Sequence, residues 1–276
     1  ESRELLCYVA AERIWAEFSR LLCGIDAGRV LREFPQVIFA ILPELFPMEG
    51  FLQYNPHHDR DVWEHTCAAV EASSPELAVR LAMLLHDCGK PGCFTLDGEG
   101  TGHFYGHAQK SLELAGTVLR RLRVPRLLGE RVLLLIHLHD RPVFPEERWV
   151  KRQLGRWGEE VFFQWLAVKE ADTLAQALAF QPPRLANLRE VEAAAQAVLR
   201  EGQCFSLKQL AVTGCDLLQL GIPQGPQVGA LLEQLVQAVI DGQVENQKET
   251  LLAYVAFLST STGEEPGKGG NPWPNM

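Results

Sequence analysis

The sequence predicts an all-α fold, a helical bundle with a short N-terminal helical segment and a C-terminal helical extension. Three observations favour it. Apolar residues recur at spacings of three and four along nearly the whole chain, as they do in a helix with one buried face. Almost no stretch alternates between apolar and polar residues, the pattern of a half-buried strand. The chain has 276 residues, of which 47% are hydrophobic, enough for a substantial core.

The helices are predicted from apolar spacing, in order along the chain. The clearest is a single stripe that follows the turn from Gly221 to Pro226. It consists of Val228, Leu231, Leu232, Leu235, Val236, Val239 and Ile240. The same spacing predicts the remaining helices at about 3–23, 36–46, 61–72, 75–88, 107–122, 127–139, 146–155, 159–179, 184–200, 206–211 and 245–258.

Helix-breaking residues divide the chain into regions. Pro43, Pro47 and Gly50 end the N-terminal helical segment, and the run Gln181-Pro182-Pro183 opens a C-terminal helical part. The last residues are rich in Gly, Pro, Ser and Thr and lack core-forming side chains, so we expect a disordered tail. The expected domains are a neck-like segment at 1–50, a metal-binding domain at 51–180, a helical body at 181–258 and the tail at 259–276.

The net charge of −9 argues against a uniformly basic coat for nucleic acid. The charge is unevenly distributed, however. Residues 120–156 contain ten Lys or Arg and four Asp or Glu, a local charge of +6 that leaves −15 on the rest. This segment is either a basic surface beside an anionic ligand or a solvated helical face, and charge alone leaves both interpretations open.

The seven cysteines include no Cys-x-x-Cys pair, which predicts neither a disulfide framework nor a zinc ribbon. A cytoplasmic location fits this usage best. No apolar run reaches the roughly 18 to 20 residues that cross a bilayer, so we expect no membrane partner. The sequence leaves the oligomeric state open.

His86 and Asp87 stand side by side where an apolar helix ends. The leucines before them predict a buried helix, and Gly89 with Pro91 ends it directly after the pair. Burying two such polar groups is costly unless they share a partner, and a metal ion is the commonest one. The pair therefore predicts a metal site.

The other candidate ligands are drawn from the same part of the chain. All eight histidines lie in it, namely His57, His58, His65, His86, His103, His107, His137 and His139. Such clustering is more typical of a site than of scattered core histidines. His65 lies in the helix predicted at 61–72, and Asp172 follows an apolar run in the helix predicted at 159–179. Each of these two, taken alone, also fits an ordinary helix position.

No other catalytic motif is evident. The chain has no Gly-x-Ser-x-Gly elbow, no phosphate-binding glycine loop followed by Lys-Ser or Lys-Thr, and no dinucleotide-binding fingerprint. Cys88 and Cys93 flank Lys90, but Cys88 fits a buried structural thiol better than a reactive one.

The order His65, His86-Asp87, Asp172 resembles the signature of the HD-domain metal phosphohydrolases. The resemblance implies an HD-type helical bundle in which these four side chains bind a divalent metal. It also implies that Lys90 lies near a substrate phosphate, where the alternative is a solvated cation at a helix end.

In two-metal members of that family, extra histidines supply the second site, and His107 and His139 fall where such ligands lie. The alternative is one ion with these two histidines as supporting or phosphate contacts. His103 and His137 are the weaker candidates, assigned to substrate binding. The resemblance thus implies one or two divalent ions, of Mn, Ni, Co, Mg or Fe.

Longer stretches resemble the bacterial CCA-adding tRNA nucleotidyltransferases. The likeness around the motif is carried by Asp61 to Thr66, His103 to Ala108 and Arg121 to Pro125. Glu12 to Leu22 is similar to the neck of those enzymes, and Asp216 to Pro226 to their C-terminal body. Their nucleotidyltransferase head carries a Gly-Ser turn and an Asp-x-Asp pair on a sheet. This sequence has neither, so we expect it not to add nucleotides itself.

The leading hypothesis is a divalent-metal-dependent phosphohydrolase, a phosphodiesterase or phosphatase that acts on nucleotides or RNA-end phosphates. In it, a metal held by residues that include the catalytic Asp87 activates water, and Lys90 or Arg141 contacts the phosphate. Arg120 and Arg123 attract RNA. One alternative is the tRNA-binding body of a CCA-adding enzyme whose catalytic head is absent from this chain. Another is a small-molecule phosphatase on a reused scaffold.

Overall fold

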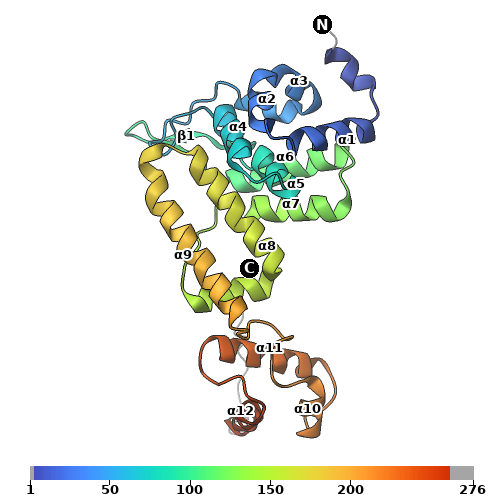
Figure 1. Cartoon of the computed structure of the whole chain (residues 1–276), viewed down its shortest axis with the longest axis vertical. Coiled ribbons are helices and arrows are strands. Elements are labelled where there is room, and N and C mark those ends of the chain that lie inside the picture. Colours follow the sequence, from blue (N-terminus) through green and yellow to red (C-terminus); the bar gives the residue numbers. More distant parts are fainter. Residues whose placement is uncertain (1–2, 262–276) are drawn as a thin grey trace. The chain divides into compact units, whose positions relative to one another are not determined.

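The computed structural model describes residues 3–261, apart from the side chains of residues 3, 4, 7 and 259–261. Helices make up nearly all of its regular structure (Figure 1), so the predicted all-α class is confirmed. The exception is a short antiparallel hairpin of β1 (Thr95–Leu96) and β2 (Gly102–His103). The expected disordered tail lies outside the described residues from 262 onward.

The helices follow the predicted order. The 3-10 helices are η1 (Arg3–Tyr8), η2 (Pro43–Met48), η3 (Lys90–Cys93) and η4 (Leu178–Phe180). The α-helices are α1 (Ala11–Leu22), α2 (Ala27–Glu33), α3 (Pro35–Ile41), α4 (Val62–Ala72), α5 (Leu77–Leu85), α6 (His107–Arg121), α7 (Arg126–Leu138), α8 (Glu147–Ala175), α9 (Gln181–Arg200), α10 (Gly214–Gln219), α11 (Pro226–Ile240) and α12 (Lys248–Ser261).

The sequence-based prediction differs from the structure in several places. The helix predicted at 3–23 is two elements, η1 and α1, and the helix predicted at 36–46 is α3 followed by η2. The prediction missed α2 and α10, which have seven and six residues and are too short to show a helical period. The helix predicted at 206–211 is wrong, because that segment forms turns. There the Gln209 carbonyl accepts a hydrogen bond of 2.8 Å from the Asn246 side chain instead of closing a helical turn. By contrast, the two helices predicted at 146–155 and 159–179 correspond to the two parts of α8, which the non-helical φ and ψ of Gly158 separate.

The chain forms two compact units. Unit 1 consists of the residues up to Glu146 together with Trp157–Ala194, and unit 2 of Glu147–Arg156 together with the residues from Ala195 onward. One crossing between the units falls next to Gly158, whose φ of 77° and ψ of 162° interrupt the helix. A positive φ of this size favours glycine. The domain boundaries expected at residues 50 and 180 remain predictions.

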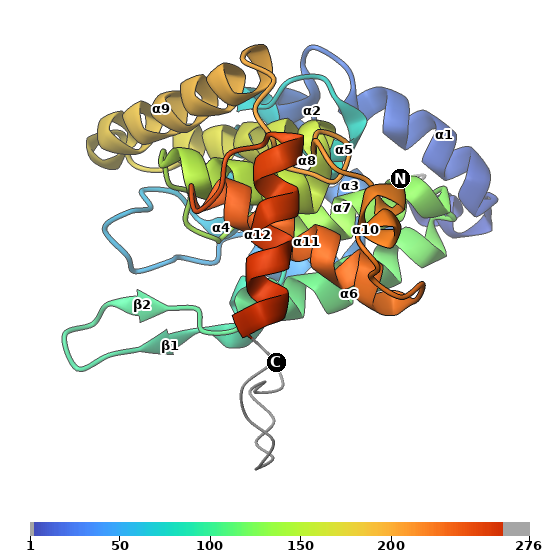
Figure 2. The same cartoon turned by 90° about the horizontal axis from the view of Figure 1, so that it is seen from below.

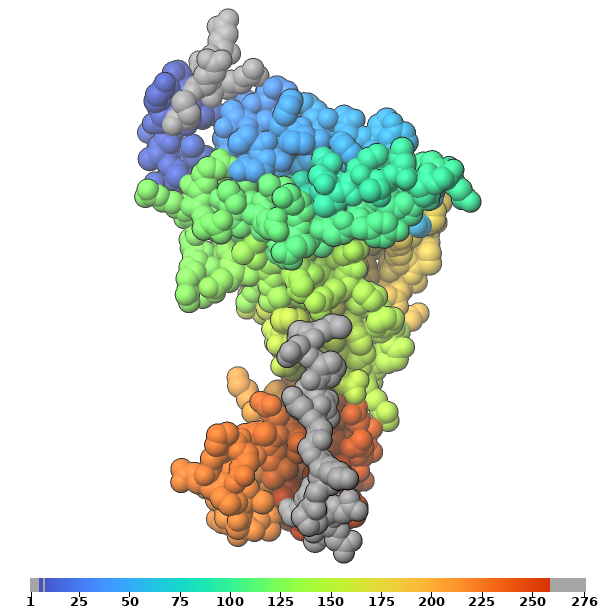
Figure 3. Space-filling view, turned by 180° about the vertical axis from the view of Figure 1, so that it is seen from behind, coloured from blue at the N-terminus to red at the C-terminus, as the bar shows by residue number. Residues whose placement is uncertain are grey.

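Helix α5 forms the centre of unit 1. Every side chain from Ala78 to Leu85 is buried, and the helix packs against α4 and α7, as expected for a helix that is apolar on all sides. The one charged member, Arg80, donates to the carbonyl oxygens of Leu22 at 2.6 Å and Ser73 at 3.2 Å. The hairpin extends away from these helices (Figure 2), and its segment forms an edge of the unit in the space-filling view (Figure 3).

Unit 2 has a separate core, formed by α10, α11 and α12 with the turns between them. Its fully buried members include Leu217, Leu235 and Leu251. Thr213 caps α10 in a reciprocal arrangement, since its hydroxyl and backbone N–H both contact Asp216. Over the described residues, no helix has the length and apolar character needed to cross a membrane.

Candidate metal centre and cleft

His65 lies on α4 and points into the interior of unit 1. Asp61 starts this helix, because its side chain accepts a hydrogen bond from the Glu64 backbone N–H at 2.7 Å. The His65 ring is fully buried. Its Nδ1 donates to the Ala175 carbonyl at 3.3 Å, and its Nε2 lies 3.0 Å from Asp172 Oδ1. The end of α8 therefore fixes both edges of the ring.

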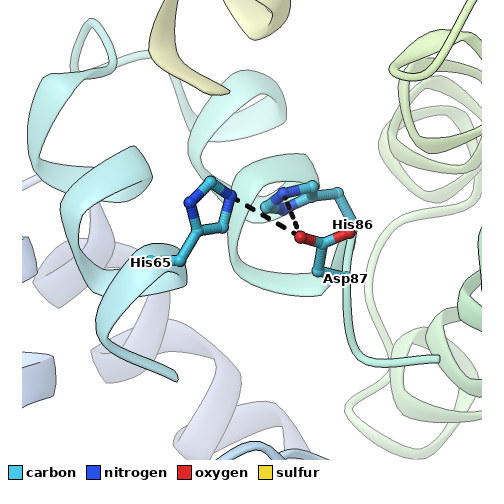
Figure 4. Close-up of side chains that lie close together, drawn as sticks. All are labelled: His65, His86 and Asp87. Carbon is cyan, nitrogen blue, oxygen red and sulfur yellow. Dashed lines mark ion pairs between the residues drawn. The ribbon is translucent and has the colours of Figure 1, made fainter. Parts of the chain in front are cut away.

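His86 and Asp87 follow α5 directly and face His65 (Figure 4). Asp87 Oδ2 lies 3.1 Å from His86 Nε2 and 3.5 Å from His65 Nε2. Both residues of the pair are buried, at 1% and 2% exposure. The expected polar pair at the end of a buried helix is thus part of a three-residue cluster.

His107 reaches the same carboxylate from the start of α6. Gly89 permits this approach, because a Cβ there would lie 2.6 Å from the His107 carbonyl oxygen and 2.6 Å from the Ser111 N. The Gly89 N–H also donates to Ser111 Oγ at 2.9 Å. His107 Nε2 consequently lies 3.5 Å from Asp87 Oδ1.

His139 completes the cluster at the end of α7. Its position is fixed from α8, where Trp165 Nε1 donates to the Leu138 carbonyl at 2.8 Å and Lys169 Nζ donates to the His139 carbonyl at 3.0 Å. His139 Nε2 lies 3.9 Å from Asp87 Oδ1 and 3.3 Å from His107 Nε2. The two oxygens of Asp87 thus each face a pair of imidazoles.

The four imidazoles share one hydrogen-bonding pattern. In each ring Nδ1 faces a backbone carbonyl, that of Ala175 at 3.3 Å, Met83 at 2.7 Å, Phe104 at 2.9 Å or Ile136 at 2.6 Å. A carbonyl oxygen only accepts, so Nδ1 carries the hydrogen and Nε2 of a neutral ring presents its lone pair. These lone pairs converge on carboxylate oxygens, an arrangement that requires protons or cations between them. The donor set therefore fits a metal ion.

Nearby positive charge stabilises the buried carboxylates of the cluster. Burial raises the pKa of Asp87, but His86 and Lys90 outweigh it and hold this pKa well below its usual range. Burial lowers the pKa of His86, but the charges of Asp87 and Asp172 outweigh it and raise this pKa to about 10. Burial and the charge of His86 lower the pKa of His139 to about 4. In the absence of an ion, the proton on His86 supplies the charge that a metal would displace.

Lys90 is a second source of positive charge. It is 5% exposed, and its Nζ lies 2.7 Å from Asp87 Oδ2. It also donates to Gln53 Oε1 at 2.8 Å and lies 5.3 Å from the centre of the Phe104 ring. Lys90 is therefore a buried partner of Asp87 and not the solvated cation considered as the alternative.

Part of this cluster lines a cleft of about 480 Å³ within unit 1. Its walls include Asp87, Lys90, His107, His139 and Asp172 from the expected site, and His103 at the hairpin. Two groups in the described chain have the spacing of metal ligands, one formed by His65, His86 and Asp87 and the other by Asp87, His107 and His139.

The remaining predicted residues lie elsewhere in the described chain. Arg141 Nη2 donates to His137 Nε2 at 2.6 Å, and neither residue lines the cleft. Arg120 donates to Thr117 Oγ1 at 3.4 Å, and Arg123 pairs with Glu12. Carboxylates also neutralise part of the positive charge of the basic segment 120–156. Six of its ten cations pair with carboxylates, namely Arg121, Arg123, Arg126, Arg131, Lys151 and Arg152.

Three further residues of the site had no role assigned from the sequence, although one of them, His58, was among the clustered histidines. Gln53 holds Lys90. His58 packs edge-on against His65 with 4.9 Å between ring centres, and burial lowers the pKa of His58 to about 3. Gln176 Nε2 donates to Asp172 Oδ2 at 3.0 Å. The signal for His58 was its place in the histidine cluster, whereas a glutamine gives no comparable signal.

The fold and the site define an all-helical protein with a buried His and Asp cluster, and comparison with known proteins identifies its class. Residues 104–255 match the family described as tRNA nucleotidyltransferase domain 2, putative. The chain belongs to this family. It is 33% identical over 95% of its length to the CC-adding tRNA nucleotidyltransferase of Thermus thermophilus, and 30% identical over 95% to the A-adding tRNA nucleotidyltransferase of Deinococcus radiodurans.

A solved structure shows the same fold. The crystal structure of the Bacillus stearothermophilus CCA-adding enzyme in complex with CTP matches 94% of this chain with a TM-score of 0.55 and 21% identity. This chain covers 54% of that one. It spans 60% and 61% of the length of the Thermus and Deinococcus proteins.

These comparisons correct the leading functional hypothesis. The prediction of a divalent-metal phosphohydrolase is wrong, as is the enzyme class derived from it, because the relatives are nucleotide-adding transferases. The HD-domain assignment is not confirmed. The physical reason is that a His and Asp cluster specifies a cation and not a reaction, so four ligands in the right order do not establish hydrolysis. The likeness to CCA-adding enzymes was the more specific signal.

Proposed function

We propose that this chain is the tRNA-binding body of a tRNA nucleotidyltransferase. One observation carries the proposal, namely that the similarity to the CC-adding and A-adding enzymes extends over 95% of the chain and so includes both compact units. A match of that extent follows the body of those proteins as a whole and is not confined to the metal motif. The proposed partner is tRNA, the substrate that the names of the relatives state.

The experiment is a titration of fluorescently labelled tRNA with the whole chain at several salt concentrations. Binding through phosphate contacts predicts an affinity that falls steeply as salt rises. Arg120→Ala removes an exposed cation that donates to Thr117 Oγ1 at 3.4 Å, and it should reduce the salt slope by about 1 if Arg120 contacts a phosphate. Absence of tRNA binding at low salt would overturn the proposal.

A second proposal concerns the cluster around Asp87. The convergence of four Nε2 lone pairs on its carboxylate favours a metal centre. His65, His86, Asp87 and Asp172 would hold one ion, and His107 and His139 would hold a second with Asp87 shared between them. Four imidazole nitrogens favour a transition metal over magnesium. The ions would supply fixed positive charge inside the cleft.

A further inference from the structure

Two aromatic rings lie parallel at the rim of the cleft. His103 and Tyr105 have 5.4 Å between ring centres and 7° between ring planes. Tyr105 is 77% exposed, so much of its ring surface is open to solvent. Both residues line the cleft. The metal centre proposed above does not use either ring.

The plane of the His103 ring is fixed by the hairpin turn. His103 Nε2 donates to Asp97 Oδ2 at 2.8 Å, and the other oxygen of Asp97 accepts the backbone N–H groups of Glu99 and Thr101, each at 2.9 Å. The His103 bond to Asp97 holds the pKa of this carboxyl below its usual range, with help from the two backbone hydrogen bonds. The ring is therefore oriented by a carboxylate that is itself immobilised.

Hydrogen bonds and ring packing in turn attach the hairpin to the rest of unit 1. Gly102 N–H donates to the Tyr54 carbonyl at 2.6 Å, and Asn55 Nδ2 donates to the Gly102 carbonyl at 3.2 Å. Phe94, before the hairpin, packs against Phe51 with 5.3 Å between ring centres. The His103 ring is thus held in place at the rim, and Tyr105 contacts it through its ring and through its hydroxyl, which lies 3.5 Å from His103 Nδ1.

We propose that His103 and Tyr105 form a stacking platform for an unpaired base of RNA. This inference rests on the proposed binding of tRNA. Every nucleobase has a flat face that stacks on aromatic rings, and single-stranded RNA is commonly bound in this way. The cleft volume of about 480 Å³ lies in the range that holds small ligands.

The charge of the cleft indicates why the base is recognised there. Asp87, Asp140 and Asp172 line the cleft, against one lysine, Lys90. A phosphate near these carboxylates is repelled unless metal ions compensate them. Stacking of a neutral base on the Tyr105 ring depends neither on these carboxylates nor on ions that compensate them, so the rim can make this contact with RNA whether or not metal ions are bound.

The test uses a short single-stranded oligoribonucleotide that contains 2-aminopurine, whose fluorescence is quenched on stacking. Tyr105→Leu should weaken binding by about 5- to 150-fold, the range for loss of one stacked base, and should remove the quenching. Tyr105→Phe keeps the ring and should retain both. Tyr8→Leu is the matched control, because Tyr8 is another highly exposed tyrosine, at 85%, on η1 and outside the cleft.

The outcomes separate this inference from the proposed function. If the wild-type chain binds folded tRNA but Tyr105→Leu binds and quenches the oligonucleotide as the wild type does, stacking is refuted and the tRNA-binding body stands. Failure of the wild type to bind the oligonucleotide while it binds tRNA also refutes stacking. If the wild type binds neither RNA, the proposed function itself is wrong. Circular dichroism confirms that each variant keeps its helices.

Discussion

The Nε2 atoms of His107 and His139 lie 3.3 Å apart, although each ring donates its Nδ1 hydrogen to a backbone carbonyl. Two lone pairs at this distance repel each other unless a proton or a cation lies between them. The same is true of the contacts between these rings and Asp87, at 3.5 Å and 3.9 Å. This geometry is the main physical argument for a metal centre in unit 1.

Removal of a proposed ligand tests the metal centre directly. His86→Ala should lower the affinity for Mn²⁺ or Ni²⁺ by more than about 100-fold, because loss of an outer-shell partner alone costs 10- to 100-fold. Isothermal titration of the chelator-treated protein gives the dissociation constant. His137→Ala removes a histidine outside the cleft and should leave it unchanged. Equal affinity of His86→Ala and the wild type would contradict the proposed ligand set.

Lys90 and Asp87 form a buried charge pair, so removal of the lysine should destabilise the fold. Lys90→Met leaves the carboxylate without its nearest cation, and such a change costs about 3–5 kcal/mol. Urea unfolding of the metal-free protein measures this loss in the free energy of unfolding. The exposed Lys110, paired with Glu113 at 3.3 Å, provides the control Lys110→Met, expected within about 0.5 kcal/mol of the wild type. Similar stability of the two variants would show that Lys90 does not neutralise Asp87.

Gly102 allows the hairpin to approach the body of unit 1. A Cβ at this position would lie 2.0 Å from the Gln53 carbonyl oxygen and 2.9 Å from the Phe94 ring. Gly102→Ala should therefore lower the free energy of unfolding by about 1–3 kcal/mol, the usual cost of overpacking. Gly98→Ala, in the same hairpin, meets no atom within 4 Å and should be nearly neutral. The prediction fails if the two variants unfold at the same urea concentration.

The cap of α10 predicts a pH dependence for unit 2. Hydrogen bonds from Lys248 and Thr213 lower the pKa of Asp216 to about 2. A carboxyl group whose pKa is lower in the folded state than in the unfolded state stabilises the fold at a pH above its unfolded-state pKa of about 3.9. That contribution is lost as the pH falls through about 2. Asp216→Asn should unfold at lower urea than the wild type at pH 7, with the difference vanishing near pH 2.

The control for this measurement is Glu245→Gln, which removes an exposed carboxylate that is not part of the cap. It should not reproduce the pH-dependent difference. A difference between Asp216→Asn and the wild type that is as large at pH 2 as at pH 7 would show that the charge of Asp216 is not its cause.

The sequence pattern predicted the members of the cluster better than it predicted their surroundings. His86 and Asp87 were evident as site residues, because burying two polar side chains at the end of an apolar helix is costly unless they share a partner. Gln53 was not, because it lies 37 residues from Lys90 in a segment without periodic structure. Arg141 carried a charge of the right sign, but only the turn after α7 determines that its guanidinium contacts His137 and not the cleft.

The basic segment shows a similar limit. Its local charge of +6 left two interpretations open, a surface for an anionic ligand or a solvated helical face, because the sum does not reveal which carboxylates fold against it. Arg121 pairs with Glu44 at 2.5 Å and donates to the Ile41 carbonyl at 2.8 Å, contacts that connect residues about 80 positions apart. Such partners can be identified only when the three-dimensional arrangement of the helices is known.

The most direct test of the account is a competition experiment with the whole chain at physiological salt. Labelled folded tRNA is displaced by unlabelled tRNA or by a scrambled RNA of the same length and composition. A tRNA-binding body predicts that folded tRNA competes at least about tenfold better, since the backbone charge of the two RNAs is equal and only shape differs. Equal competition by the scrambled RNA would contradict the account.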